Sequence, residues 1–215
     1  MPSVFPPWSN GVFRGALGVA AFGVVAVVLA PMVWVRSPAR RNEFLPVDQP
    51  VEFDHRHHVA DEGIDCRYCH NTPDRAPTAG MPSTDKCMGC HAQIWNQSIM
   101  TDPIRRSYFS GQPIPWNRVY QLPDFVFFNH EAHVTHGVGC STCHGRVDRM
   151  PRVYQVVSLT MGWCLDCHRD PAKHLRPLDE ITDMRWLPEE HPAEAEATAR
   201  ALHVRSLTNC TTCHR

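Results

Sequence analysis

Residues 128–144 read FNHEAHVTHGVGCSTCH, and this stretch decides the fold of the chain. It ends in Cys140, Cys143 and His144, a C-x-x-C-H motif that is typical of covalent c-type haem attachment. On one helical turn, positions i, i+3 and i+4 share a face, so two thiols and an imidazole can reach one porphyrin. The stretch therefore predicts a helix that carries a haem.

The same motif accounts for every cysteine in the chain. The ten cysteines form five C-x-x-C pairs, and a histidine follows each pair directly. Zinc ribbons use such pairs in twos, which five pairs do not fit. With 14 histidines in 215 residues, the probability that a histidine follows all five C-x-x-C pairs by chance is on the order of one in a million. We predict five covalent haems c, with these thioether cysteines and proximal iron ligands: Cys66, Cys69 and His70; Cys87, Cys90 and His91; Cys140, Cys143 and His144; Cys164, Cys167 and His168; Cys210, Cys213 and His214.

An internal repeat organises the motifs. The pattern F-x-H-x-x-H occurs at residues 53–58 and again at 128–133, and two C-x-x-C-H motifs follow each copy. From the second histidine of the pattern to the next cysteine is eight residues in the first copy and seven in the second. The repeat predicts two di-haem modules, 53–91 and 128–170, in which each H-x-x-H pair serves two different irons. The predicted distal ligands are His55, His58, His130 and His133.

The fifth distal ligand is open. Met161, three residues before Cys164, is one candidate, although methionine is also a common packing residue. His174 and His203 are imidazole rivals, and Met81 is a looser counterpart of Met161. The remaining histidines are expected at the surface or against haem propionates: His57, His136 and His191.

Composition bounds the fold class. The formal net charge of −1 gives no basic field for nucleic acid or anionic lipid. The 19 prolines and 12 glycines predict a loop-rich domain. We expect a mainly α fold with extensive loops, a multihaem domain whose core is mostly porphyrin, behind one N-terminal transmembrane helix.

The amino terminus carries an apolar run. After an N-terminal segment, 1–14, residues 15–35 read GALGVAAFGVVAVVLAPMVWV without a charge, which is enough to cross about 30 Å of hydrocarbon. A cleaved signal peptide and a buried soluble helix are the alternatives, but the run exceeds the usual 7–15-residue apolar region of a signal. We expect a retained single-pass anchor.

Orientation of the anchor involves a conflict. Arg36, Arg40 and Arg41 follow the apolar run, and the positive-inside rule would keep them in the cytoplasm. Covalent haem attachment takes place outside the cytoplasmic membrane. We expect the haem domain on the periplasmic, outer side, because long domains translocate largely regardless of flanking charge.

Three segments complete the predicted organisation. Residues 36–52 form a linker, and residues 92–127 form a connecting or docking segment of irregular chain without a histidine. Residues 171–215 form a C-terminal arm with the fifth haem. Within this arm, Pro192–Arg205 carries helix start and stop signals.

The sequence resembles a known family. The stretches FDHRHHVADEGIDCRYCH, FNHEAHVTHGVGCSTCHGRVDRMP, MGWCLDCHR and NCTTCHR are similar to those of the pentahaem cytochrome c subunit of bacterial alternative complex III, and more widely to class III multihaem cytochromes. This resemblance implies a quinol-oxidising complex of the cytoplasmic membrane. Its implied partners are an iron-sulfur subunit of molybdopterin-oxidoreductase type, polytopic quinol-binding membrane subunits and a mono-haem cytochrome c. It also favours Met161 as the fifth distal ligand.

We expect an electron-transfer subunit rather than an enzyme: no catalytic residue is predicted, and no substrate bond is broken on this chain. One alternative is a membrane-anchored quinol dehydrogenase that feeds a periplasmic reductase. Another is a multihaem reductase with an open iron site, often signalled by lysine in place of a motif histidine, and no motif here has one.

Overall fold

The computed structural model describes residues 4–214, which divide into two units. The first ends at Glu43 and the second begins at Phe44. In the first unit, helix α1 spans Ser9–Arg36 and is long and apolar enough to cross a membrane. It begins six residues before the predicted run at Gly15, because Val12 and Phe13 extend the apolar sequence and only Arg14 interrupts it. At its end the Ser37 hydroxyl donates to the Trp34 carbonyl at 2.7 Å.

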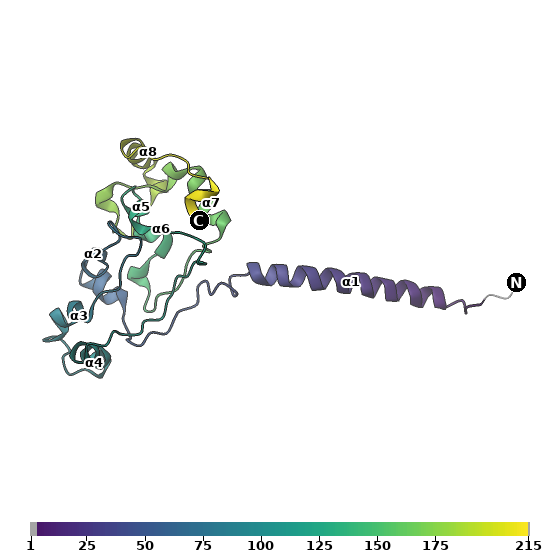
Figure 1. Ribbon diagram of the computed structural model, residues 1–215, viewed down its shortest axis with the longest axis horizontal. Helices are drawn as coiled ribbons and strands as arrows, with labels where there is room; N and C mark the ends of the chain where they lie inside the picture. The colour runs from purple at the N-terminus through teal and green to yellow at the C-terminus, as the bar shows by residue number, and fades with distance from the viewer. Residues whose placement is uncertain (1–3, 215) are drawn as a thin grey trace. The chain divides into compact units, whose positions relative to one another are not determined.

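The second unit consists of short helices joined by long loops (Figure 1). Within residues 44–214 there is no β-strand, and isolated bridges join Val126 with His214 and Val138 with Leu175. The α-helices are α2 (Cys66–Cys69), α3 (Thr84–His91), α4 (Asp102–Ser110), α5 (His130–Val134), α6 (Cys140–His144), α7 (Met161–Arg169), α8 (Pro192–Ala201) and α9 (Cys210–Cys213). The other helical segments are a π-helix, Arg56–Asp61, and short 3₁₀ turns at Ile99–Thr101, Val147–Arg149, Pro171–His174, Leu178–Glu180 and Pro188–Glu190.

Five of these helices coincide with the cysteine motifs. Each C-x-x-C pair lies on one helical turn, in α2, α3, α6, α7 and α9. Side chains begin two of these helices: Asp65 accepts a hydrogen bond from the Arg67 backbone before α2, and Thr160 accepts one from Trp163 before α7. The predicted placement of both thiols on one turn is therefore present in all five helices, and the histidine belongs to the helix in α3, α6 and α7.

The protein core is small and lies toward the carboxyl end. Most of the buried apolar side chains come from residues 150–195: Met150, Leu175, Ile181, Met184, Trp186 and Ala195. Val51 and Ile104 are the other two in the described chain. So few apolar residues fit a domain whose core is mostly porphyrin, and the mainly helical, loop-rich fold class is confirmed.

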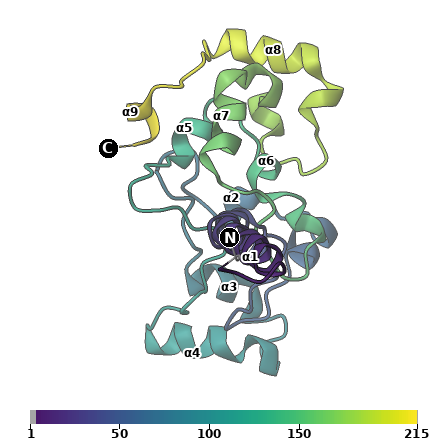
Figure 2. The ribbon, with the colours of Figure 1, turned by 90° about the vertical axis from the view of Figure 1, so that its right-hand side faces the viewer.

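Two helices differ from expectation. The connecting segment 92–127 is not wholly irregular, because α4 occupies Asp102–Ser110; it has proline in its first turn and ends at Gly111, whose φ of 67° is left-handed. Helix α8 begins at Pro192 as predicted but ends at Ala201 rather than Arg205, because His203 has a left-handed φ of 51°. Figures 1 and 2 show α4 at one end of the second unit and α8 at the other, with α2, α5, α6 and α7 between them.

Candidate haem-binding sites

The two copies of F-x-H-x-x-H have the same ring geometry. Phe53 lies 4.8 Å from His55 at 83° and 4.4 Å from His58 at 23°, measured between ring centroids and planes. In the second copy Phe128 lies 4.8 Å from His130 at 87° and 4.5 Å from His133 at 28°. The phenylalanine in each copy therefore packs edge-on against the first imidazole and stacks on the second, which fixes both rings.

The backbones of the two copies differ. His55 precedes a π-helix, whereas His130 opens the α-helix α5. The Glu62 N–H donates to the His57 carbonyl at 3.0 Å, five residues back. The first copy has one more residue before its cysteine motif, and the wider turn of the π-helix accommodates this extra residue.

Three distal histidines face motif histidines. The ring centroids of His58 and His91 are 6.2 Å apart, those of His133 and His168 6.0 Å, and those of His130 and His144 6.4 Å. Imidazole nitrogens bind metals at about 2.0–2.1 Å, so two imidazoles on opposite sides of one iron have centroids roughly 6.3 Å apart. The three pairs match this spacing.

The planes of these pairs are not alike. The imidazoles of His58 and His91 are inclined at 61°, and those of His133 and His168 at 72°. His130 and His144 are nearly parallel, at 9°. Tyr120 packs on His144 with centroids 4.6 Å apart, and its hydroxyl donates to the Cys143 carbonyl at 3.1 Å. The pair on α5 and α6 is thus geometrically distinct from the other two.

Most candidate ligands direct Nδ1 at a backbone carbonyl, which leaves Nε2 free for a metal. The carbonyl partners of the motif histidines are Gly80 for His70 at 2.8 Å, Ile94 for His91 at 3.0 Å, Leu207 for His168 at 3.0 Å and Phe125 for His214 at 3.1 Å. Those of the distal histidines are Asp54 for His58 at 3.0 Å, Pro77 for His130 at 2.8 Å and Asn129 for His133 at 2.8 Å.

His55 is the exception among the distal candidates. Its Nδ1 is buried without a hydrogen-bond partner in the described chain. Burial, together with the nearby His70 and His58, lowers the pKa of His55 to about 4. His55 and His70 are therefore close neighbours, which is compatible with the predicted role of His55 as a distal ligand at the first motif.

Burial keeps the central imidazoles neutral. It lowers the pKa of His144 to about 4, with contributions from His130, His70 and His55, and it also lowers the pKa of His133. Neutral imidazole is the form that binds a metal. At pH 7 these side chains are ready to act as ligands without loss of a proton.

The thiols give the spatial order of the motifs. Burial raises the pKa of Cys87, and the nearby Cys69 adds to this. The pKa of Cys66 is raised by its hydrogen bond with Cys140 and then by burial. Motif 87–91 therefore neighbours motif 66–70, which in turn neighbours motif 140–144.

The order continues through the second half of the chain. Burial raises the pKa of Cys143 to about 12, and the nearby Cys167 adds to this. Burial also raises the pKa of Cys164, with a further contribution from Cys213. The five motifs thus form a row, in which 87–91 is at one end, 66–70, 140–144 and 164–168 follow, and 210–214 is at the other end.

The last motif is held by residues of the connecting segment. Val126 and His214 form an antiparallel bridge, and the Phe127 N–H donates to the Cys213 carbonyl at 2.8 Å. No ring pair between His214 and another histidine is present among residues 4–214. Met161, the first residue of α7, is 62% exposed.

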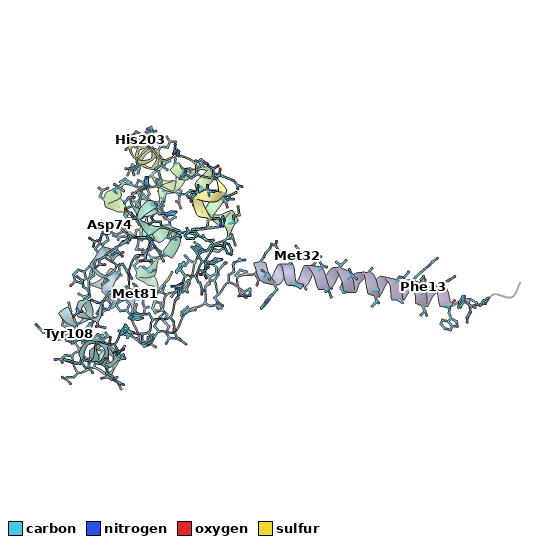
Figure 3. The ribbon with its side chains drawn as sticks, in the orientation of Figure 1. Phe13, Met32, Asp74, Met81, Tyr108 and His203 are labelled. Carbon is cyan, nitrogen blue, oxygen red and sulfur yellow. The ribbon has the colours of Figure 1, made fainter. Side chains whose placement is uncertain are left out.

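The other candidates for the fifth ligand are dispersed. His174 ends the 3₁₀ turn Pro171–His174, and His203 lies at the α8 end of the unit (Figure 3). Met81, 60% exposed, follows the carbonyl that accepts from His70. His57 lies 3.5 Å from Asp61, and the side chains of His136 and His191 bond to the Ala132 carbonyl and to Glu194 respectively.

Sequence reasoning missed two residues beside the motifs, Tyr120 and Arg176. Tyr120 lies in the connecting segment and is half-buried, and burial raises its pKa to about 12. Arg176 is 1% exposed. Neither belongs to a repeat or a motif, so only their long-range contacts reveal them.

The residues present fit haem c. All ten cysteines are free thiols, each pair lies one turn from its histidine, and three histidine pairs have the spacing of two ligands on one iron. The buried orphan Nδ1 of His55 adds an unsatisfied polar atom at a fourth motif. These motifs and the mainly helical, loop-rich fold are typical of multihaem c-type cytochromes.

Comparison with known proteins supports this class. Residues 126–215 match the model of cytochrome c7 and related cytochrome c, and residues 31–108 match the class III cytochrome C family. Haem is covalently bound in cytochromes c, so these matches imply covalent haem c as the cofactor. The chain is 35% identical over 133 residues to the multihaem cytochrome c subunit of menaquinone reductase from Nitratidesulfovibrio vulgaris strain Hildenborough. The match covers 59% of this chain, and the chain spans about 59% of the length of that relative.

Proposed function

We propose that the chain is a membrane-anchored pentahaem cytochrome c, the electron-transfer subunit of a quinol-oxidising complex of alternative complex III type. In this proposal it relays electrons to a mono-haem cytochrome c or a terminal acceptor. The observation that carries the proposal is the row of five motifs along one domain. Haem iron, when bound, supplies one-electron transfer between its ferric and ferrous states.

The proposed ligand sets follow from the ring pairs. His58 is assigned with His91, His130 with His144 and His133 with His168, because the spacing of each pair fits one iron. His55 is assigned with His70 through their close approach. Each H-x-x-H pair then serves two irons, and the domains 53–91 and 128–170 are two di-haem modules.

Met161 is proposed as the distal ligand of the fifth site, opposite His214. The approach of Cys213 to Cys164 brings α9 close to α7, which begins at Met161. Near-infrared magnetic circular dichroism of the holoprotein should then show one sulfur-ligated haem, and that signal should be lost in Met161→Leu. If five bis-histidine signatures are found, the assignment is wrong, and His174→Ala and His203→Ala become the variants that identify the ligand.

The proposed location is the cytoplasmic membrane, with α1 as a single-pass anchor and the haem domain on the periplasmic side. Support comes from the length and apolar composition of α1 and from the need for haem attachment outside the cytoplasm. Partners would be an iron-sulfur subunit of molybdopterin-oxidoreductase type and polytopic quinol-binding subunits. Protease added to intact spheroplasts should digest the haem domain, whereas protection would place this domain inside.

A second candidate function reverses the direction of electron flow. The similar protein from Nitratidesulfovibrio vulgaris is named a subunit of menaquinone reductase, which favours delivery of electrons to a quinone rather than removal from a quinol. Both functions share the five-haem relay and differ in which partner is the donor.

Anaerobic assays on the purified native complex separate the functions. The first proposal predicts haem reduction by a quinol analogue and reoxidation by a mono-haem cytochrome c. The reverse direction predicts that reduced cytochrome delivers electrons to menaquinone in the same preparation. Haem reduction by quinol in the isolated subunit would instead support a self-sufficient quinol dehydrogenase.

A further inference from the structure

Arg176 is a buried cation that forms no ion pair within the described residues, and the carboxylates of Asp183, Glu180 and Glu189 act on it only at longer range. It is 1% exposed, and its Nη1 donates to the backbone carbonyl of Asp183 at 2.7 Å. Its Nη2 donates to the Ser141 hydroxyl at 3.0 Å, and its Nε is buried without a hydrogen-bond partner in the described chain. The Asp183 carboxylate accepts instead from the Arg185 backbone N–H. The positive charge of Arg176 is therefore not cancelled by a direct ion pair.

The guanidinium lies at the start of motif 140–144. A Cβ built on Gly139 would lie 2.1 Å from Cζ of Arg176, so the group rests directly on the backbone before Cys140. On another side it contacts the ring of Trp186, with Cζ 5.1 Å from the ring centroid. An apolar ring and a glycine backbone are surroundings that screen a charge poorly.

This place is also the junction between the two di-haem modules. Cys140 lies close to Cys66 of the first module, and His130 of the second module contacts the Pro77 carbonyl of the first at 2.8 Å. The first motifs of the two modules therefore meet near the guanidinium. In the row of five motifs, the contact between 66–70 and 140–144 is the one that joins the modules. The charge of Arg176 thus lies beside the motif of the second module that neighbours the first module.

A fixed positive charge stabilises the reduced form of a nearby iron. When ferric iron takes up one electron it becomes ferrous and loses one unit of positive charge, which relieves repulsion with a neighbouring cation. Arginine stays protonated in proteins, so this effect does not depend on pH in the working range. Burial strengthens it because the local dielectric is low.

We propose that Arg176 sets the potential at the module junction, making the haem attached to Cys140 and Cys143 easier to reduce. The proposal rests on the proposed function, since it requires covalent haem at this motif. Ser141 and the carbonyls of residues 180 and 183 position the guanidinium, and Gly139 admits it. The neighbouring haem on Cys66 and Cys69 should feel the same charge.

The test is an EPR-monitored redox titration of the full-length holoprotein in detergent. The nearly parallel pair His130 and His144 should give its haem a signal distinct from those of the crossed pairs. We expect Arg176→Met to lower the ratio of reduced to oxidised haem at this motif about tenfold at fixed ambient potential, which corresponds to about 59 mV. The matched variant Arg176→Lys keeps the charge and should retain most of the ratio. The proposal would be overturned if Arg176→Met had the same ratio of reduced to oxidised haem as the wild type. It would also be overturned if Arg176→Met and Arg176→Lys lowered this ratio equally.

A second pair of variants leaves Arg176 in place. Ser141→Asp puts a carboxylate against the guanidinium and should lower the same ratio, whereas the isosteric Ser141→Asn should not. If Asp and Asn shift the ratio equally, the charge is not the cause and the proposal falls. Mass spectrometry of haem peptides separates failure of the Arg176 proposal from failure of the proposed function. If the wild-type protein carries no haem on Cys140 and Cys143, the Arg176 proposal and the pentahaem function are both wrong.

Discussion

The two F-x-H-x-x-H copies solve the same problem with different backbones. Both place a phenylalanine edge-on against one imidazole and stacked on the next, with centroid distances that agree within 0.1 Å, 4.4 and 4.5 Å for the stacked pairs. The first copy does so at a π-helix and the second on an α-helix. The difference teaches that the ring arrangement is the constrained feature, while the helix type adapts to the length of the segment that follows.

The copies also differ in how they are tied to the rest of the domain. His130 donates from Nδ1 to the Pro77 carbonyl of the first module at 2.8 Å, whereas Nδ1 of His55 has no partner in the described chain. A residue of the first module thus helps to hold the second copy in place. Changes near Pro77 in the first module should therefore also reach the second copy.

Single-residue deletions should produce the largest contrast. Deleting Glu62 gives the first copy the seven-residue spacing of the second, and we expect the π-helix to become an α-helix with all haems retained. Deleting Val138 shortens the second copy, which has no extra residue to lose, and should abolish haem attachment in residues 128–170. Haem content by pyridine haemochrome and peptide mass spectrometry measures both; equal haem loss in the two variants would contradict the insertion account.

Replacement of the second histidine in each copy should act on a distant motif. We expect His133→Met to change the haem on Cys164 and Cys167, and His58→Met the haem on Cys87 and Cys90. Histidine–methionine ligation raises the reduction potential, so one haem in each variant should titrate higher. The assignment would be wrong if His133→Met altered only the haem on Cys140 and Cys143.

A methyl group should be tolerated in one module and not in the other. In Gly139→Ala the new Cβ would lie 2.1 Å from Arg176, and overpacking of this kind costs about 1–3 kcal/mol. In Gly89→Ala, within α3, nothing in the described chain lies within 4 Å of the new Cβ, so stability should change by no more than about 1 kcal/mol. Denaturant unfolding of the two holoproteins compares them, and equal stability would show that Arg176 yields easily.

The smallest expected effect is at the residues that begin the two ligand helices. Asp54 accepts a hydrogen bond from the Arg56 backbone at 2.9 Å, and Asn129 accepts one from Glu131 at 2.9 Å. We expect Asp54→Ala and Asn129→Ala each to cost about 1 kcal/mol of unfolding free energy. Thermal unfolding followed by circular dichroism provides the measurement, and a much larger loss in only one variant would show that the caps are not equivalent.

The sequence predicted the local features of the sites well. The C-x-x-C-H spacing predicted one helical turn, and every C-x-x-C pair lies on one, although His70 and His214 directly follow their helices. The F-x-H-x-x-H repeat identified two equivalent segments, and the structure adds that their rings are arranged alike through contacts within six residues. The apolar run at residues 15–35 likewise predicted the helix that contains it.

Features that depend on long-range packing could not be predicted from the sequence. The order of the motifs follows from contacts such as that between Cys66 and Cys140, which are 74 residues apart in the chain. Tyr120 and Arg176 matter through what they touch, and no periodicity marks them. Helix α4 was missed because proline, glycine and scattered aromatics conceal a nine-residue helix in a segment that otherwise forms loops.

The most direct test of the account is the mass of the intact holoprotein under denaturing conditions. Covalent haems survive unfolding, so the two modules and the C-terminal motif predict the polypeptide mass plus five haems. Peptide mapping should find one haem on each cysteine pair. A chain that retains four haems or fewer, or that carries zinc or disulfides at any pair, would contradict the account of two di-haem modules and a fifth site.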